Sequence, residues 1–226
     1  MSQHPTFDSL FEDAVLASYA KQAQLATLIG NRRWDFDMDT GVLTFGGEIA
    51  WKTQILGTES QSTGTWLWAW ANAASNIPPG LVASAKLLAE KGKEWGIPEL
   101  TERERRRDGR FNGHAVAMIA CQLAGGASYY RGPYDGGAIY LLITDASFPR
   151  ATDDPQALAA LFPKAISVMP FHHRNAFLSY VRQQGWTVKQ DETRSSVLVE
   201  GKPAVALTFD RLGRLTGIEA TLRPAG

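Results

Sequence analysis

Three tryptophans at every second position are the feature of this sequence most suited to binding. Trp66, Trp68 and Trp70 lie in one short apolar run, and Asn72 follows. If this run is a β-strand, the three indoles project from the same side of it. Such a surface can stack on a sugar, a base or the side chains of a partner protein, and tryptophan is enriched in interface hot spots. The alternative is that these indoles belong to the core and pack beneath a helix such as 7–29.

A second candidate for binding is the turn-rich segment 128–137. Tyrosine offers an apolar ring with a polar tip, and arginine can hold a carboxylate or a phosphate with two hydrogen bonds. The alternative is an ordinary hairpin, in which the glycines take positive φ values and the tyrosines cover the sheet edge. The candidate binding residues of this segment are Tyr129, Tyr130, Arg131, Tyr134 and Asp135.

Three alternating aspartates resemble the opening of a calcium loop, but the remainder of the pattern is absent. Asp35, Asp37 and Asp39 would occupy its first ligand positions. The sixth position then falls on Thr40 rather than glycine, and the twelfth on Gly46 rather than glutamate. We therefore expect no metal site and predict that these acids lie on a solvated strand face.

The histidines and the cysteine do not form a recognisable catalytic set. His114 and Cys121 share one helix face, but their separation of roughly 10 Å along the axis is too long for a Cys–His dyad. His172 and His173 lie near the start of a helix, where a general base, a ligand, or a surface or capping role is open. The surface or capping role is favoured. The sequence also lacks the common zinc, nucleophile, phosphate and dinucleotide motifs, so we expect no cofactor and favour a non-enzymatic role.

Composition narrows the classes of partner. The chain of 226 residues has 23 Lys and Arg against 23 Asp and Glu, so no overall field attracts nucleic acid or an anionic membrane. One cysteine makes no internal disulfide. The most apolar window, 65–74, is far shorter than the roughly 20 residues that span a bilayer. Nucleic acid is therefore not expected as a partner, no membrane association is expected, and the expected compartment is the cytoplasm.

Hydrophobic periodicity predicts an α+β fold in which antiparallel sheet meanders pack with about four to five helices. We expect one domain, 1–226, with candidate lobes 1–145 and 146–226. Five helices are predicted from apolar spacing, and a charged one at 99–110 from its five arginines and four acids. The apolar helices are expected at 7–29, 79–92, 114–123, 155–161 and 171–184. The strands are expected at 34–38, 42–45, 49–55, 65–70, 128–131, 138–144, 187–190, 197–200, 204–209 and 215–222.

The run Thr65–Asn72, together with the strand that begins at Trp34 and the segment Tyr129–Tyr134, resembles a bacterial family known only as a domain of unknown function. The likeness covers about residues 8–144. This resemblance implies a bacterial, cytosolic protein. It implies no activity and no catalytic residues.

These features lead to three hypotheses about function, of which the last is a structural subunit of a larger assembly, which a large flat apolar patch would support. The first is a non-enzymatic binding protein that recognises a protein partner, of the immunity or accessory type, through its aromatic strand and loop. The alternative is a small-ligand receptor or enzyme with a pocket between sheet and helices. In that case Arg131, Asp135 or His173 would serve as polar anchors.

Overall fold

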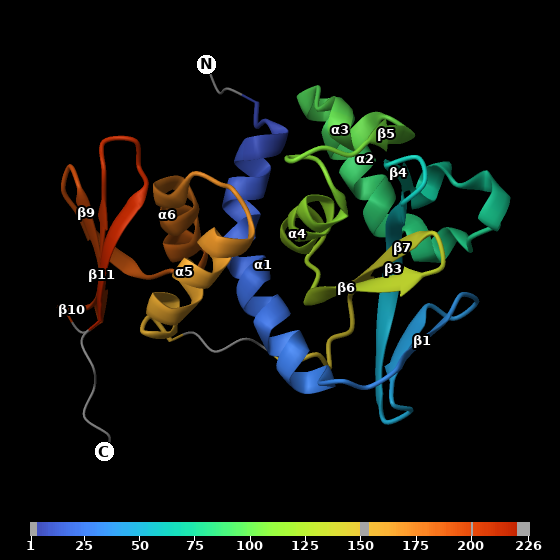
Figure 1. Cartoon of the computed structure of the whole chain (residues 1–226), viewed down its shortest axis with the longest axis horizontal. Helices are drawn as coiled ribbons and strands as arrows, with labels where there is room; N and C mark the ends of the chain where they lie inside the picture. Colours follow the sequence, from blue (N-terminus) through green and yellow to red (C-terminus); the bar gives the residue numbers. More distant parts are fainter. Residues whose placement is uncertain (1–3, 150–153, 200, 221–226) are drawn as a thin grey trace. The chain divides into compact units, whose positions relative to one another are not determined.

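The computed structural model describes residues 4–149, 154–199 and 201–220, and it confirms the α+β class with antiparallel sheets (Figure 1). The chain divides into two compact units. Unit 1 comprises residues 1–11 and 21–150, and unit 2 comprises residues 12–20 and 151–226. Helix α1 (Phe7–Ile29) contributes residues to both. It begins at a capping box, in which Thr6 and Ser9 satisfy each other's backbone N–H groups.

Unit 1 is built on a seven-stranded sheet in which every pairing is antiparallel. The 12-residue strand β3 organises it, because its first part pairs with β2 and its second part pairs with β4 and β7. The strands are β1 (Trp34–Asp37), β2 (Val42–Phe45), β3 (Ile49–Ser60), β4 (Thr65–Trp68), β5 (Glu104–Arg106), β6 (Ser128–Tyr134) and β7 (Gly137–Ile143).

The part of this sheet formed by β3, β4, β6 and β7 has two contrasting faces. Residues directly opposite one another in an antiparallel pair project to the same side. Thr58 lies opposite both Leu67 and Ile139, and these three define what we call the hairpin face. Glu59 lies opposite Trp66, on the other side, which we call the helix face. The β1–β2 hairpin covers part of the first face, and helices α2 (Ala83–Trp95) and α4 (Gly113–Leu123) pack against the second.

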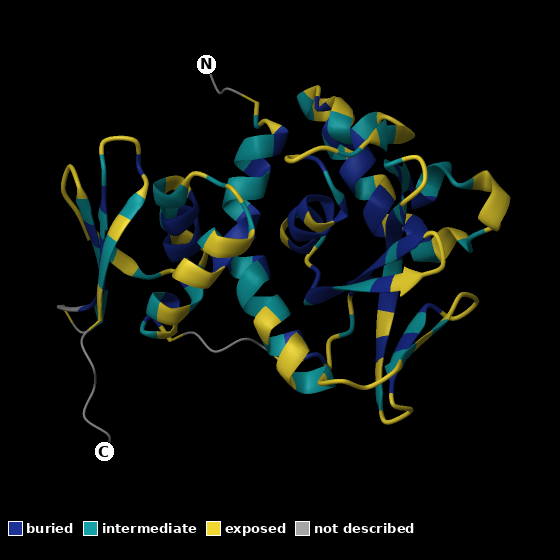
Figure 2. Ribbon diagram, in the orientation of Figure 1, coloured by how far each residue is buried: buried dark blue, intermediate teal, exposed yellow. Residues whose placement is uncertain are grey.

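Helix α4 is the most deeply buried helix of unit 1 (Figure 2). The Asn112 side chain caps it by accepting a hydrogen bond from the Ala115 N–H. A Cβ at Gly113 would lie 2.4 Å from ring carbons of Tyr140, so only glycine lets the helix start this close to the sheet. Ala117 and Ala120 are fully buried, and their small side chains allow the rest of the helix to pack closely in the core of unit 1.

The structure corrects two expectations in unit 1. The charged segment 99–110 is not one helix: a four-residue helix, α3 (Pro98–Thr101), is followed by the edge strand β5, which pairs with β4. The segment lacks an apolar stripe, so nothing holds it as a helix against the core. The strand predicted through Trp70 ends at Trp68, where three short 3-10 turns begin. These turns are η1 (Ala69–Ala71), η2 (Ala73–Ser75) and η3 (Pro79–Val82).

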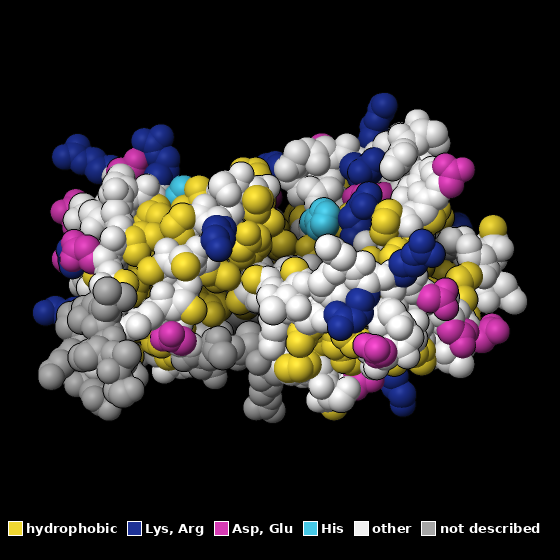
Figure 3. All heavy atoms as spheres, turned by 60° about the horizontal axis from the view of Figure 1, so that its bottom comes forward, with side chains coloured by type: hydrophobic (Ala, Val, Ile, Leu, Met, Phe, Trp, Pro, Cys, Tyr) yellow, Lys and Arg dark blue, Asp and Glu magenta, His cyan; other side chains and the backbone are white. Residues whose placement is uncertain are grey.

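Unit 2 combines a four-stranded antiparallel sheet, in the order β11-β10-β9-β8, with two helices. Phe177 of α6 packs against Phe209 of the sheet, with ring centroids 5.9 Å apart. Figure 3 shows hydrophobic side chains gathered on the surface of this unit, and Val168 of α5 is a large hydrophobic residue that is 59% exposed. The elements are α5 (Ala157–Val168), α6 (His173–Gln183), β8 (Thr187–Gln190), β9 (Arg194–Val199), β10 (Lys202–Phe209) and β11 (Leu215–Ala220).

Helix α5 is longer than the segment 155–161 that was expected, and it contains Pro163. Leu158, Phe162 and Ala165 are buried at helical spacing, which continues the helix past the proline. The predicted strand ends at Glu200 and Leu222 lie outside the described residues.

Within the described ranges no helix is both long and apolar enough to cross a membrane.

Candidate functional site

The helix face of unit 1 holds a buried charged network. Glu59 is only 5% exposed, and its Oε1 accepts a hydrogen bond from the Gly113 N–H at 2.7 Å. Its Oε2 accepts from the Tyr140 hydroxyl at 3.0 Å and lies 3.3 Å from Nη1 of Arg107. Arg107 also donates to the Ser60 carbonyl at 3.1 Å. A buried carboxylate with three such partners ties the start of α4 to β3 and β7, so its first role is structural.

Three rings extend this network toward β6. The His114 Nδ1 and the Tyr129 hydroxyl are hydrogen-bonded at 2.9 Å, and both rings pack against Tyr140. Burial raises the pKa of Tyr129 well above its usual value, and burial followed by the Glu59 charge raises the pKa of Tyr140. Burial of the ring also lowers the pKa of His114. Both tyrosines therefore stay neutral hydrogen-bonding groups at physiological pH.

The tryptophan run packs inside unit 1 rather than forming an exposed platform. Trp66 and Trp68 are 0% exposed, which confirms the core alternative for these two residues. Trp66 packs on Trp68 and Tyr140, with ring centroids 5.5 and 5.4 Å apart. Trp70 lies in η1, after the strand has ended, and its indole stacks on that of Trp68 at 6.4 Å. A stacking surface made of all three indoles is therefore ruled out.

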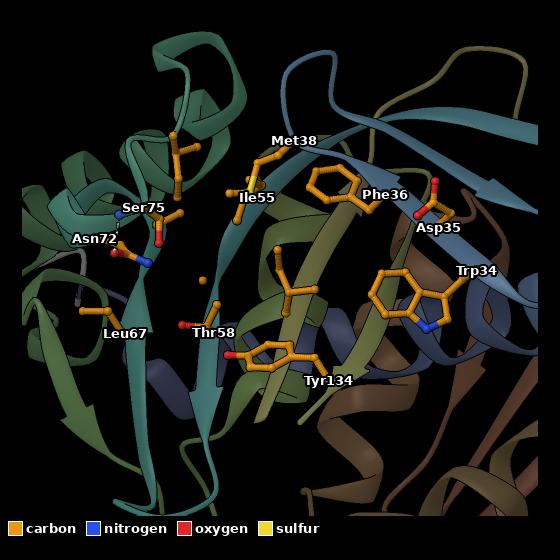
Figure 4. Close-up of a pocket in the computed structure, with 14 residues that line it drawn as sticks. Trp34, Asp35, Phe36, Met38, Ile55, Thr58, Leu67, Asn72, Ser75 and Tyr134 are labelled. Carbon is orange, nitrogen blue, oxygen red and sulfur yellow. Dashed lines mark hydrogen bonds between the residues drawn. The ribbon is translucent and has the colours of Figure 1, made fainter. Parts of the chain in front are cut away.

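The hairpin face is different, because part of it is hollow. A pocket of about 590 Å³ lies between the β1 hairpin, the hairpin face and the η1–η2 segment (Figure 4). Ligand pockets are commonly 300–1,000 Å³ and mostly apolar. The lining residues are Trp34, Asp35, Phe36, Met38, Ile55, Gly57, Thr58, Leu67, Ala69, Asn72, Ser75, Ile77, Tyr134 and Ile139.

One wall of the pocket is aromatic and is supported from behind. Trp34 and Phe36 alternate with acids along β1, so both rings project from the inner side of the hairpin. The Trp34 indole packs against Tyr130, with ring centroids 5.6 Å apart. A Cβ at Gly132 would lie 2.7 Å from the Trp34 ring, so the indole rests directly on the glycine backbone. Phe45 also packs against Tyr130, with ring centroids 4.9 Å apart.

The opposite end of the pocket is polar but uncharged. Asn72 Oδ1 accepts the Ser75 N–H at 3.3 Å, and the Asn72 amide nitrogen is directed toward the hollow (Figure 4). In Figure 4 the Tyr134 hydroxyl is directed toward Thr58, and the Thr58 hydroxyl is directed toward Leu67. Within the described residues the structure records no hydrogen-bond partner for either hydroxyl. These groups can therefore serve a polar part of a ligand.

The pocket is lined by one predicted residue from each of the two candidate binding segments, and the other predicted residues lie outside its lining. Asn72 and Tyr134 line it, although they come from different segments. Arg131 lies opposite Tyr140 and therefore projects to the helix face, as Tyr129 does. Tyr130 supports the aromatic wall without lining the hollow. Asp135 is exposed in the turn after Tyr134 and does not line the pocket.

His172 and His173 serve as acceptors for backbone N–H groups in unit 2. His172 caps α6, and its Nδ1 accepts the Asn175 N–H at 3.3 Å, so the capping role favoured from the sequence is confirmed. His173 Nδ1 accepts the Leu215 N–H at 2.9 Å. Among the described residues no three His, Cys, Asp or Glu side chains cluster as metal ligands would.

Sequence analysis missed the residues that form the aromatic wall. Trp34, Phe36 and Met38 alternate with acids, and that alternation was interpreted only as a strand with one solvated face. The signal that could have found them is the size of the apolar members: two large aromatics and a methionine on so short a strand need a surface to cover. Neither Met38 nor Tyr134 is fully covered, at 41% and 47% exposed.

A second hollow of about 520 Å³ lies beside the start of α1, and it is mainly polar. Its charged side chains are already paired: Arg110 forms an ion pair with Asp8, and Arg105 lies 3.7 Å from Glu99. It therefore offers less to a ligand than the pocket on the hairpin face.

The fold and the site together define an α+β protein in which one sheet face is packed by helices and the other holds an open, aromatic-walled pocket. Residues 8–146 match the family of unknown function DUF6882, and the chain belongs to this family. The matched range contains every residue of the pocket and of the Glu59 network. No curated protein and no solved structure shows significant similarity to the chain.

Proposed function

We propose that this protein is a binding protein whose ligand is a small, largely apolar molecule held in the pocket of the hairpin face. One observation carries the proposal: a hollow of about 590 Å³ whose apolar walls face the Thr58 and Tyr134 hydroxyls, for which the described residues provide no hydrogen-bond partner. An apolar hollow with a few convergent polar groups is the usual form of a small-ligand site.

The polar end supports a defined orientation for such a ligand. Asn72 is held by its bond to the Ser75 N–H, so its amide nitrogen presents a fixed donor. The ligand's apolar body would lie on Leu67 and Ile139 and against the aromatic wall, with its polar end near the Thr58 hydroxyl. Burying a polar group in this pocket requires such a partner, because an unpaired one costs about 1–3 kcal/mol.

A protein partner is the second candidate, and the rim of the pocket favours it. Met38 and Tyr134 are two of the four large hydrophobic side chains that are exposed in the described ranges, and both line this pocket. A partner could insert one apolar side chain between them, as hot-spot residues do. The hollow is larger than one side chain needs, so we place the small ligand first.

A plugging variant tests the proposal. Thr58→Phe places a ring inside the hollow. Thr65→Phe is the matched control, because Thr65 lies on the same face of the sheet as Leu67 but does not line the pocket. Ligand-observed NMR with a fragment library should find fragments that bind the wild type and Thr65→Phe but not Thr58→Phe. If all fragments bind the three proteins equally, or none binds the wild type, the proposal is wrong. Native mass spectrometry of the protein purified gently from cells would identify a polypeptide partner, whose binding Met38→Ser should weaken.

A further inference from the structure

As far as the structure describes the chain, the pocket has an aromatic wall and no basic side chain. Among its 14 lining residues are Trp34, Phe36 and Tyr134, and Asp35 carries the lining's single full charge at neutral pH. None of the described residues that line it is a lysine, an arginine or a histidine. A pocket that binds an anion normally presents at least one such group, because a buried carboxylate or phosphate needs a counter-charge or several N–H donors.

The three rings are arranged around space rather than against each other. In the described part of the chain no ring contact joins Trp34, Phe36 and Tyr134, and Figure 4 shows them bordering the same hollow. The Trp34 indole is fixed by Tyr130 and by the backbone at Gly132. Aromatic faces carry negative electrostatic potential, and several of them around one space form a site for an organic cation.

Three aspartates of the β1 hairpin also favour a cation over an anion in the pocket. Asp35, Asp37 and Asp39 are exposed along the same hairpin, and in Figure 4 the Asp35 carboxylate lies behind Trp34 and Phe36. Their negative charge adds to the potential at the aromatic wall. At the other end, the Arg103 guanidinium donates to the Ala71 carbonyl at 3.4 Å, beside Asn72. A bound cation would therefore have its charged head at the hairpin end.

We propose that the ligand of this pocket is an organic cation, in which an alkylated ammonium or a cationic nitrogen ring lies against Trp34, Phe36 and Tyr134. This inference rests on the proposed function and adds the chemical class of the ligand. The apolar body of the cation would contact Leu67 and Ile139, and a polar arm would reach the neutral end of the pocket. Anions of the same size should bind more weakly, because they would face the aromatic wall and the acids of the hairpin.

Two probes of equal shape and a smaller anion, all with a benzyl group, test the effect of charge. Benzyltrimethylammonium is a cation, neopentylbenzene is its neutral isostere, and phenylacetate is an anion. Affinities measured through the change in tryptophan fluorescence should favour the cation over the neutral isostere by about 10-fold, which is the range expected for a partly desolvated cation over aromatic rings. Phenylacetate should bind more weakly than either. Equal or tighter binding of the neutral isostere or of phenylacetate would overturn the inference.

Two sets of variants test whether the aromatic wall causes the preference for the cation. Using two sets avoids dependence on one substitution that could disturb folding. Phe36→Leu and Asp35→Asn should each lower the preference for the cation, while Asp135→Asn, outside the lining, should leave it unchanged. Fluorinated tryptophan keeps the size of the indole but reduces the negative potential of its face. Incorporated at all seven tryptophans, of which only Trp34 lines the pocket, it should weaken the cation several-fold and leave the neutral isostere unaffected. Equal weakening of both probes would contradict the assignment.

The outcomes distinguish this inference from the proposed function. If fragments bind in a manner that Thr58→Phe abolishes, yet the cation shows no advantage, the pocket is a ligand site of another class and only the inference fails. If no fragment and no probe binds the wild type, both fail.

Discussion

The two faces of the unit 1 sheet come from the same strands, but they differ in how their polar and aromatic groups are used. On the helix face, Glu59 has three polar partners, and Trp66 and Trp68 are fully buried. On the hairpin face, the Thr58 hydroxyl and the Trp34 ring border a hollow. Residues that resemble each other in type thus hold the fold on one side and are available to a ligand on the other. Burial distinguishes the two roles, and residue type alone does not.

The largest expected difference between the faces is in the stability effect of losing an aromatic ring. Trp66→Ala should lower the free energy of unfolding by about 3–5 kcal/mol, because it leaves a cavity in a closely packed core. Phe36→Ala should cost about 1 kcal/mol, because its ring is only half-buried beside an existing hollow. Urea unfolding followed by near-UV circular dichroism measures both. Equal losses would remove the distinction between the faces.

Breaking the Glu59 network should have the next largest effect. Glu59→Gln removes the charge opposite Arg107 but keeps an acceptor for the Tyr140 hydroxyl, so we expect a loss of about 3 kcal/mol. The matched control is Glu48→Gln, because Glu48 is exposed and lies 4.0 Å from Arg32. The control should change stability by less than about 1 kcal/mol. A Glu59 variant as stable as the control would show that the network is not structural.

Gly132→Ala sharpens the comparison by disturbing the aromatic wall from behind. The added methyl group would lie 2.7 Å from the Trp34 ring and must displace the indole into the pocket. We expect a stability loss of about 1–3 kcal/mol and a shift in tryptophan fluorescence. Gly136→Ala is a poor control because its φ is +84°, whereas Gly109→Ala meets nothing within 4 Å and suits the purpose. Unchanged fluorescence in Gly132→Ala would mean that Trp34 does not rest on this backbone.

Much of the local structure could be predicted from the sequence. The helix at 7–29 and the hairpin at 128–144 follow from apolar spacing and from the glycines of the turn, and both are confirmed. The helix predicted at 99–110 was wrong, because the pairing of this segment with β4 at the sheet edge is a tertiary effect that its charge pattern does not encode. Propensity and charge are weak guides where another strand is available.

The site was harder to predict than the fold. Asn72 and Tyr134 come from the two candidate segments and both line the pocket, and their role as ligand contacts is still a prediction. Trp34 and Phe36 were missed, because their position depends on β3 pairing with β2 over one part and with β7 over another. That long-range pairing brings Trp34 to Gly132, and no local pattern in either segment records it.

Tyr134→Phe should separate binding from stability with a small change. Its hydroxyl has no partner in the described residues, and the residue is 47% exposed, so we expect the free energy of unfolding to change by less than about 0.5 kcal/mol. The affinity of a bound fragment that uses this hydroxyl should fall several-fold. Isothermal titration beside thermal unfolding gives both values. A large loss of stability would assign the hydroxyl to the fold instead.

The smallest expected effect is the pH dependence that His114 contributes. Its pKa is lowered in the folded state by burial of the ring, so the unfolded chain binds a proton more readily than the folded protein does. The stability it contributes is therefore present above the unfolded pKa near 6.5 and is lost as the pH falls through that value toward the folded pKa. His114→Gln should flatten the pH dependence between about pH 5 and 7. An unchanged slope would show that the ring is not buried against Tyr129 and Tyr140.

The most direct test of the two-face account is the indole N–H spectrum of the protein during titration with the tightest-binding fragment. Each of the seven tryptophans gives one indole signal, so both faces are observed in the same experiment. The account predicts that the Trp34 signal shifts with ligand concentration while those of Trp66 and Trp68 stay in place. Movement of the Trp66 and Trp68 signals with a stationary Trp34 would place the ligand on the helix face and contradict the account.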